Sequence, residues 1–213
     1  MLNHITNKVR SVVKVLPFYL FTLLALFTSC SEDNVEVEEF VNWQTVNENY
    51  FNGLYATAKQ KQNAGDPTWK VLRNYSLNEI MAVNPEDYIV VEVLESGTET
   101  ESPLFSDSVQ VNYRGRLLPS TSYSEGYVFD QTYVGDFNPA TAAAAKLPVN
   151  YRVDGLATAF QYMHVGDRWR IYIPSALGYG ASGTSGVPAY STLIYDVRLV
   201  AFAHAGHSLP SFQ

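Results

Sequence analysis

The sequence predicts an α+β domain: a curved antiparallel β-sheet, or half barrel, wrapped around one short helix and preceded by an N-terminal helical extension. Two periodicities lead to this fold class. Apolar residues recur every three or four positions between residues 40 and 61, as on one face of a helix, whereas from residue 87 onward they alternate, as in half-buried strands. One short helical segment interrupts the alternating region, so a sheet that curves around it would bury both sets of apolar residues.

The composition is that of a small acidic globular protein. Of its 213 residues, 46% are hydrophobic and 16% are charged, which is enough apolar material for one core of ordinary size. The net charge of −7 argues against a nucleic-acid partner, because binding to phosphates depends on clustered basic residues. The single cysteine excludes a disulfide framework and a cysteine-rich metal site.

Residues 1–29 have the charge pattern of a signal peptide. Basic residues precede an apolar run at residues 15–27, and no acidic residue occurs in the segment. The run has about 13 residues, fewer than the roughly 20 that a transmembrane helix needs. The only cysteine, Cys30, follows directly after Ser29, and this arrangement resembles the lipobox of bacterial lipoproteins, in which the cysteine is acylated.

That resemblance implies a Bacteroides-like bacterial lipoprotein, anchored by a lipid on Cys30 in the cell envelope. The outer membrane of a Gram-negative bacterium is the expected location, with the periplasmic or surface face left open. Residues 30–39 would then be an acidic tether between the membrane and the folded part of the chain. A general secretory signal that happens to end near a buried cysteine is the alternative.

Residues 40–86 are predicted to form a helical extension. The apolar residues of its first half recur at helical spacing as far as Ala58, and Gly65 followed by Asp66 and Pro67 supplies a stop. Such an apolar face needs a surface to cover it, either the following domain or a second copy in a homodimer. A second short helix is expected near residues 77–83.

Residues 87–202 contain the strands of the predicted sheet. A short helix with Asp154 as its cap interrupts them and ends before Gly166. Residues 203–213 are expected to be a tail, with His204 and His207 in solvent. The segments that alternate or are rich in β-branched residues are 88–94, 109–117, 169–173 and 193–202, with Ser-, Gly- and Ala-rich loops at 119–126 and 134–147.

Four motifs in this region resemble the FKBP family of peptidyl-prolyl isomerases. VQVNYRGRL at residues 109–117 is similar to the family's V-x-V-x-Y-x-G-x-L strand, and GYVFDQT at 126–132 to its G-x-x-F-D-x-[ST]. The third motif runs from VDGL at 153–156 through MHVGDR and IYIP to LGYG at 177–180, and the fourth is VPAYSTLIYDV at 187–197. Their order and spacing match the family along residues 86–202.

The resemblance implies a peptidyl-prolyl cis-trans isomerase, or rotamase, that assists the folding of exported proteins. Tyr179 would donate a hydrogen bond to a substrate carbonyl, and Asp130 would lie in the wall of the cleft; these two are the catalytic candidates. Macrolide inhibitors would bind the same cleft, but more weakly, since Leu156 stands where the family commonly has tryptophan. The residues expected to bind the proline-containing segment are Tyr113, Phe129, Val153, Leu156, Val187, Tyr190 and Tyr195.

The chemistry of prolyl isomerisation agrees with this interpretation of the cleft. An X-Pro bond isomerises slowly because amide resonance sets a barrier of about 18–20 kcal/mol. An apolar cleft that excludes water disfavours the planar amide, so no nucleophile, metal or cofactor is needed. One departure concerns the segment before Val153, which is shorter than in compact family members, so that either Tyr151 or Val149 could supply its cleft residue.

Other function classes have less support. Residues 178–183 spell G-x-G-x-x-G, but Gly186, Pro188 and a strand follow where a nucleotide-binding loop would open a helix. The main alternative is a non-catalytic module with the same cleft, which would bind exposed segments of other proteins as a chaperone. A third reading is a surface lipoprotein that captures glycans on exposed tyrosines.

Overall fold

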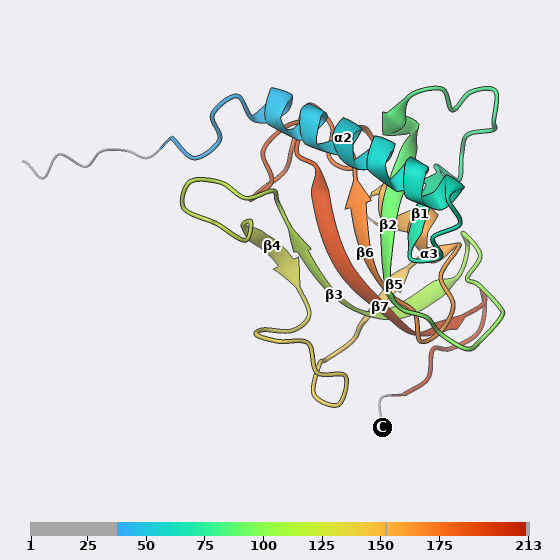
Figure 1. Cartoon of the computed structure of the whole chain (residues 1–213). Helices are drawn as coiled ribbons and strands as arrows, with labels where there is room; N and C mark the ends of the chain where they lie inside the picture. The colour runs from blue at the N-terminus through green and yellow to red at the C-terminus, as the bar shows by residue number, and fades with distance from the viewer. Residues whose placement is uncertain (1–37, 152, 212–213) are drawn as a thin grey trace, which may run out of the picture. The chain divides into compact units, whose positions relative to one another are not determined.

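The computed structural model describes residues 38–151 and 153–211, so the expected signal peptide, Cys30 and most of the expected tether lie outside the described residues. Two helices, seven strands and two short 3-10 helices follow one another along this part of the chain (Figure 1). They are α2 (Trp43–Asn63), β1 (Trp69–Arg73), η2 (Pro85–Asp87), β2 (Tyr88–Glu95), β3 (Ser108–Arg116), β4 (Val128–Gln131), β5 (Ala145–Pro148), α3 (Asp154–Phe160), β6 (Arg168–Ile173), η3 (Ser175–Leu177) and β7 (Leu193–Ala203).

The strands form one antiparallel sheet in the order β1-β2-β6-β7-β3-β4, with β5 paired to β3. Figure 1 shows this sheet as open and curved, with α2 lying across it. The predicted fold class is therefore confirmed. The strands expected from the alternating pattern agree with β2, β3, β6 and β7 to within a residue or two at their ends.

The two helices pack on opposite faces of the sheet. The ring of Tyr172 in β6 lies 6.5 Å from that of Tyr50 in α2. The next residue, Ile173, faces α3, where a Cβ added to Gly155 would lie 2.3 Å from the Cγ2 atom of Ile173. Since successive side chains of a strand point to opposite faces, α2 covers the outer face and α3 the inner one. Gly155 lets α3 approach the strand closely.

The apolar face of α2 is buried on its own domain, which was one of the two predicted outcomes. Trp43, Phe51 and Ala58 are buried along this face. Hydrogen bonds fix the helix to the chain just before β7: the Nε1 atom of Trp43 donates to Ser191 Oγ (2.8 Å), and Asn47 Oδ1 accepts from the Thr192 amide (2.7 Å). The helix begins at Trp43, three residues after the expected start.

The segment between α2 and β2 differs from the expectation. β1 is already part of the sheet, which therefore begins before residue 87. The prediction of a short helix near residues 77–83 is wrong, because that segment is a turn held by side-chain hydrogen bonds. Asn78 Oδ1 accepts from the amides of Ile80 and Met81, and Asp87 Oδ2 from the amide of Val83. Asn and Asp side chains compete in this way with helical hydrogen bonds.

Three smaller differences concern the second half of the chain. Val153, not Asp154, is the N-cap of α3, and Asp154 is its first helical residue. The alanine-rich loop at residues 134–147 ends in a strand, β5. His204 is only partly in solvent: its side chain is 44% exposed, its Nδ1 lies 2.8 Å from Oδ2 of the buried Asp107, and its Nε2 lies 3.0 Å from Glu101. His207 is exposed, as expected.

No helix among the described residues combines the length and the apolar character needed to cross a bilayer.

Candidate functional site

A small apolar cavity lies between α3 and the strands β3, β4, β5 and β7. Its volume is about 10 Å³. A water molecule needs a cavity of about 10–15 Å³, so the side chains around it nearly fill the space. The residues that line it are Tyr113, Asp130, Leu147, Tyr151, Leu156, Phe160, Tyr195 and Val197.

One polar pair lies in this apolar surround. The hydroxyl of Tyr113 donates a hydrogen bond to Asp130 Oδ2 at 3.0 Å. Thr132 sets up the pair, since its amide donates to the Tyr113 carbonyl (2.9 Å) and its Oγ1 accepts from the Tyr113 amide (3.0 Å). The F-D-x-T motif thus connects β4 to β3 beside Tyr113. Half-buried Asp130 thereby gains the partner that burial of a carboxylate requires.

Aromatic packing forms the wall behind this pair. Phe129 and Tyr195 meet edge to face with centroids 5.5 Å apart, and Tyr113 lies 6.1 Å from Tyr195. A Cβ on Gly115 would lie 2.7 Å from Tyr195 Cε1 and 2.8 Å from Phe129 Cζ. The glycine of the Y-x-G motif is therefore required for these rings to close over β3.

The short helix supplies the floor of the cavity. Leu156 and Phe160, four residues apart on one side of α3, are buried against the sheet. Their side chains and those of Tyr195 and Val197 are less than 6% exposed, whereas Leu147 and Tyr151 are only half-buried. Leu147 and Tyr151 close the cavity from the outside.

Residues 178–190 form a compact loop near the cleft. The Gly180 amide donates to the Ser175 carbonyl (2.8 Å), and the Tyr190 amide donates to the Gly180 carbonyl (2.9 Å). Gly180 has a positive φ of 60°, and Tyr190 one of 61°. Tyr179 lies in this loop, half-buried and packed against the core.

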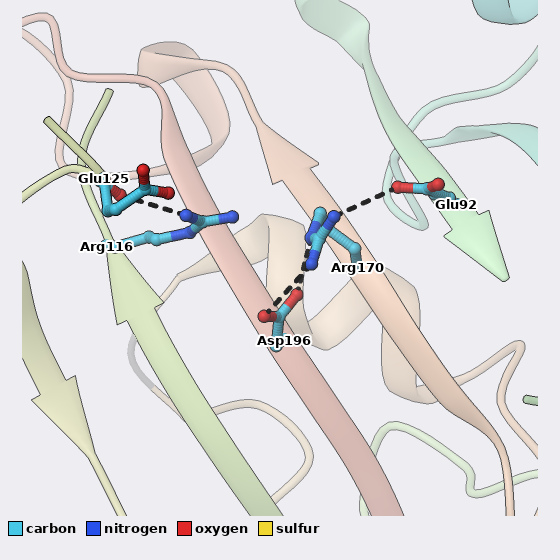
Figure 2. Close-up of polar contacts among 5 residues, drawn as sticks. All are labelled: Glu92, Arg116, Glu125, Arg170 and Asp196. Carbon is cyan, nitrogen blue, oxygen red and sulfur yellow. Dashed lines mark hydrogen bonds and ion pairs between the residues drawn. The ribbon is translucent and has the colours of Figure 1, made fainter. Parts of the chain in front are cut away.

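A cluster of charged residues lies on the other face of the sheet. Figure 2 shows Arg170 between Asp196 (2.8 Å) and Glu92 (3.5 Å), and Arg116 donating to the Glu125 carbonyl (3.0 Å). Burial lowers the pKa of Arg170, but the hydrogen bond and charge of Asp196 outweigh it and raise that pKa. The guanidinium is thus always charged. Since Asp196 follows Tyr195, alternation along β7 keeps the ions away from the aromatic cavity.

Comparison with known proteins identifies the domain to which this cavity belongs. Residues 99–200 match the family model described as FKBP-type peptidyl-prolyl cis-trans isomerase. This region of the chain, a little under half of it, is therefore similar to that family. The match agrees with the family that the four motifs predict.

The FKBP-type relatives come from distant organisms. The macrophage infectivity potentiator of Trypanosoma cruzi is 33% identical over 126 residues, which are 59% of this chain and 58% of that protein. The FKBP-type peptidyl-prolyl cis-trans isomerase FkpA of Escherichia coli K12 is 30% identical over 152 residues, 68% of this chain and 50% of that protein. The chain thus spans little more than half the length of these relatives.

A solved structure supports the fold. The peptidyl-prolyl cis-trans isomerase of Pseudomonas syringae pv. tomato superposes with a TM-score of 0.51 at 24% sequence identity, covering 73% of this chain and 92% of that one. At this identity the likeness concerns the fold alone.

The matched region brings together only part of the predicted site. Of the nine predicted residues, Tyr113, Asp130, Leu156 and Tyr195 line the small cavity, and Phe129 packs behind them on Tyr195. The remaining four line no part of the small cavity. Val153 is buried as the N-cap of α3, Val187 lines a different cavity, and Tyr179 and Tyr190 lie in the 178–190 loop.

Four lining residues were not among the predicted ones. Tyr151 occupies the place for which Tyr151 and Val149 were both considered, and Val149 is fully buried away from the cavity. Phe160 and Val197 could have been found from spacing, since they lie four residues after Leu156 and two after Tyr195 on the same faces. Leu147 gives a weaker signal, because β5 has only four residues over which its burial alternates.

Proposed function

We propose that the protein is a peptidyl-prolyl cis-trans isomerase that acts on proline-containing segments of exported proteins. The observation that carries the proposal is the Tyr113–Asp130 hydrogen bond set in an otherwise apolar, aromatic cavity of an FKBP-type domain. The polar pair is fixed before substrate arrives, and the other lining side chains offer carbon and ring edges to a proline.

The reaction needs no covalent step on this account. Rotation about the X-Pro bond removes amide resonance, and water favours the planar amide by hydrogen bonding to its polarised carbonyl. Leu156, Phe160 and Tyr195 would exclude water from the bond and so destabilise the planar form relative to the twisted one. Tyr179, with its loop residues Val187 and Tyr190, would bind the flanking carbonyl and the preceding side chain.

Binding requires the cavity to open. A volume of about 10 Å³ has no room for a proline ring. Four of the lining residues are half-buried, and two of them, Tyr113 and Asp130, are fixed by their hydrogen bond. Leu147 and Tyr151 can therefore move at least cost, because less apolar surface is exposed when they turn outward than when a fully buried side chain does. Substrate would therefore displace these two side chains and leave the floor in place.

The small volume of this cavity favours a second candidate function. With Leu156 in the floor and the cavity nearly filled, the domain could bind exposed segments of other proteins without accelerating isomerisation. It would then act as a chaperone-like module.

Relaxation from cis to trans of a short proline peptide distinguishes these two functions. We expect the full chain to accelerate relaxation, and Asp130→Ala and Tyr179→Phe each to reduce that acceleration. Tyr162→Phe is the control, since Tyr162 is 45% exposed and lies outside the cavity lining. A folded protein that binds unfolded clients but gives no acceleration would replace the isomerase by the non-catalytic module.

We also propose that Cys30 carries a lipid that anchors the protein in the cell envelope, in the outer membrane of a Gram-negative bacterium. The support is the basic, then apolar, then small-residue pattern that ends at the only cysteine. Labelled palmitate should be incorporated by the full chain and lost in Cys30→Ala. Incorporation that survives this substitution would contradict the anchor.

One further binding property follows from the isomerase proposal. Macrolides that mimic a proline segment should compete for the cavity, weakly because of Leu156.

A homodimer through α2 would have to use the part of the helix left exposed, which includes Val46 (43%) and Tyr50 (38%). Sedimentation of the full chain in detergent tests it, since a monomer at every concentration would rule the dimer out.

A further inference from the structure

A second and much larger cavity lies at the N-terminal end of α2. Its volume is about 630 Å³, within the range of about 300–1,000 Å³ typical of ligand sites. Three separate segments meet there: the turn before α2, the loop before β4 and the loop before β7 (Figure 1). The lining residues are Glu39, Phe40, Ser122, Tyr123, Tyr127, Thr184, Gly186, Val187 and Pro188, none of which lines the small cavity.

The walls of this large cavity are aromatic and held in place. The rings of Tyr123 and Tyr127 meet edge to face at 5.0 Å. Phe40 packs in the same way on Trp43 at 4.8 Å, and the Trp43 indole is itself hydrogen-bonded to Ser191. Phe40 is therefore positioned by the same contacts that dock α2 on the sheet.

A carboxylate lies among these rings. Glu39 Oε1 accepts hydrogen bonds from the Ser120 hydroxyl and from the Ser122 amide, the latter at 2.8 Å. The Ser120 hydrogen bond, followed by that of Ser122, lowers the pKa of Glu39, so the group is ionised at neutral pH. A carboxylate can accept about four hydrogen bonds, so capacity remains for a ligand.

We propose that this cavity binds an arginine or lysine side chain, together with an adjoining apolar residue, of an extended polypeptide. Aromatic faces attract cations, and Glu39 adds a full negative charge beside them. The net charge of −7 further favours a basic partner. A purely apolar ligand would bury the Glu39 carboxylate with no opposite charge beside it, and an anionic ligand would be repelled by it.

The large cavity lies close to the proposed proline site. A Cβ on Gly186 would lie 3.6 Å from Tyr127 Cε1 and 3.9 Å from Phe129 Cβ, so the 183–188 loop lies over β4. Phe129 in turn packs on Tyr195. One client could reach both cavities across β4; this last point rests on the proposed isomerase function, whereas binding in the large cavity does not.

The test measures binding of labelled, proline-free peptides to the full chain by fluorescence polarisation. One peptide has a single arginine between two phenylalanines, and its partner has glutamate at that place. We expect the arginine peptide to bind at least about tenfold more tightly, with an affinity that falls as salt rises. Equal binding of both peptides, or no binding of the arginine peptide, would overturn the proposal.

Two variants locate the binding. Tyr123→Ala should weaken the arginine peptide about tenfold, and Glu39→Gln should remove most of the preference over glutamate. Tyr162→Ala is the matched control, since both tyrosines are more than two-fifths exposed. Unchanged binding in both variants would overturn the proposal. Tyr123→Ala should leave the relaxation of a proline peptide unchanged, so failure of the binding proposal and failure of the isomerase proposal give different results.

Discussion

The two cavities differ in size, in origin and in what a ligand must do to enter. The small cavity, at about 10 Å³, is lined by strands and a helix that carry the family motifs. The large cavity, at about 630 Å³, combines two loops with residues 39–40, which lie outside the matched region. The first must open before it binds, whereas the second is already open. Family motifs therefore predict the closed site, whereas they supply only Tyr127, Val187 and Pro188 to the open one and do not predict that these meet residues 39–40.

The largest expected effect comes from filling the space behind the small cavity. Gly115→Ala places a methyl group 2.7–2.8 Å from Tyr195 and Phe129. We expect a loss of about 1–3 kcal/mol in the free energy of unfolding and loss of most isomerase activity, because both rings must move. Urea unfolding and peptide relaxation measure the two effects. Arginine-peptide binding should persist in the folded protein; its loss would mean that the cavities are not independent.

The next effect comes from opening the small cavity. Tyr151→Ala removes one of its two half-buried closing side chains. We expect kcat/KM for a proline peptide to rise about three- to tenfold, since substrate no longer has to displace the ring. Tyr162→Ala controls for loss of an exposed ring. If Tyr151→Ala lowers kcat/KM instead, Tyr151 is part of the binding surface and not an obstruction.

A smaller effect is expected where α2 docks on the sheet. Trp43→Phe removes the hydrogen bond to Ser191 and part of the support of Phe40, and should cost about 1–2 kcal/mol of unfolding free energy. Arginine-peptide binding should weaken about threefold while isomerase activity stays the same. Trp69→Phe, in the half-buried β1, is the control. Reduced isomerase activity in Trp43→Phe alone would show that α2 supports the small cavity as well.

The smallest effect concerns pH. The hydrogen bonds that His204 makes to Asp107 and Glu101 raise the pKa of His204 above its usual 6.5. Stability from this group is therefore fully present below pH 6.5 and is lost as pH rises through the higher pKa of the folded state. The thermal midpoint should fall between those values. His204→Gln should remove this slope and His207→Gln should not; a slope unchanged in His204→Gln would contradict the assignment.

Local pattern was enough to predict most of the fold. Each of these elements buries one apolar face, so its apolar residues recur at a short, regular spacing in the sequence. This spacing predicts strands at β2, β3, β6 and β7 and a helix at α2. The prediction of a helix at residues 77–83 failed because the side chains of Asn78 and Asp87 replace helical hydrogen bonds there. The hydrogen bonding of His204 was missed because its partner, Asp107, is 97 residues away in the chain.

For the site, too, local motifs could be read from the sequence and long-range contacts could not. Tyr113, Asp130, Leu156 and Tyr195 lie in motifs whose spacing is fixed by strand and helix geometry, and they do line one cavity. Tyr179 and Val187 belong to a loop whose course depends on long-range packing, and they lie elsewhere. Nothing in the sequence brings Glu39 and Tyr123 together, since that meeting depends on how α2 docks.

The most direct test compares the same chemical change in the two cavities. Tyr113→Phe removes the hydroxyl that donates to Asp130 in the small cavity, and Tyr123→Phe removes a hydroxyl in the large one. In the peptide relaxation assay we predict that Tyr113→Phe loses most of the acceleration and Tyr123→Phe retains it. Loss of acceleration in Tyr123→Phe, with full activity in Tyr113→Phe, would contradict the assignment of isomerisation to the small cavity.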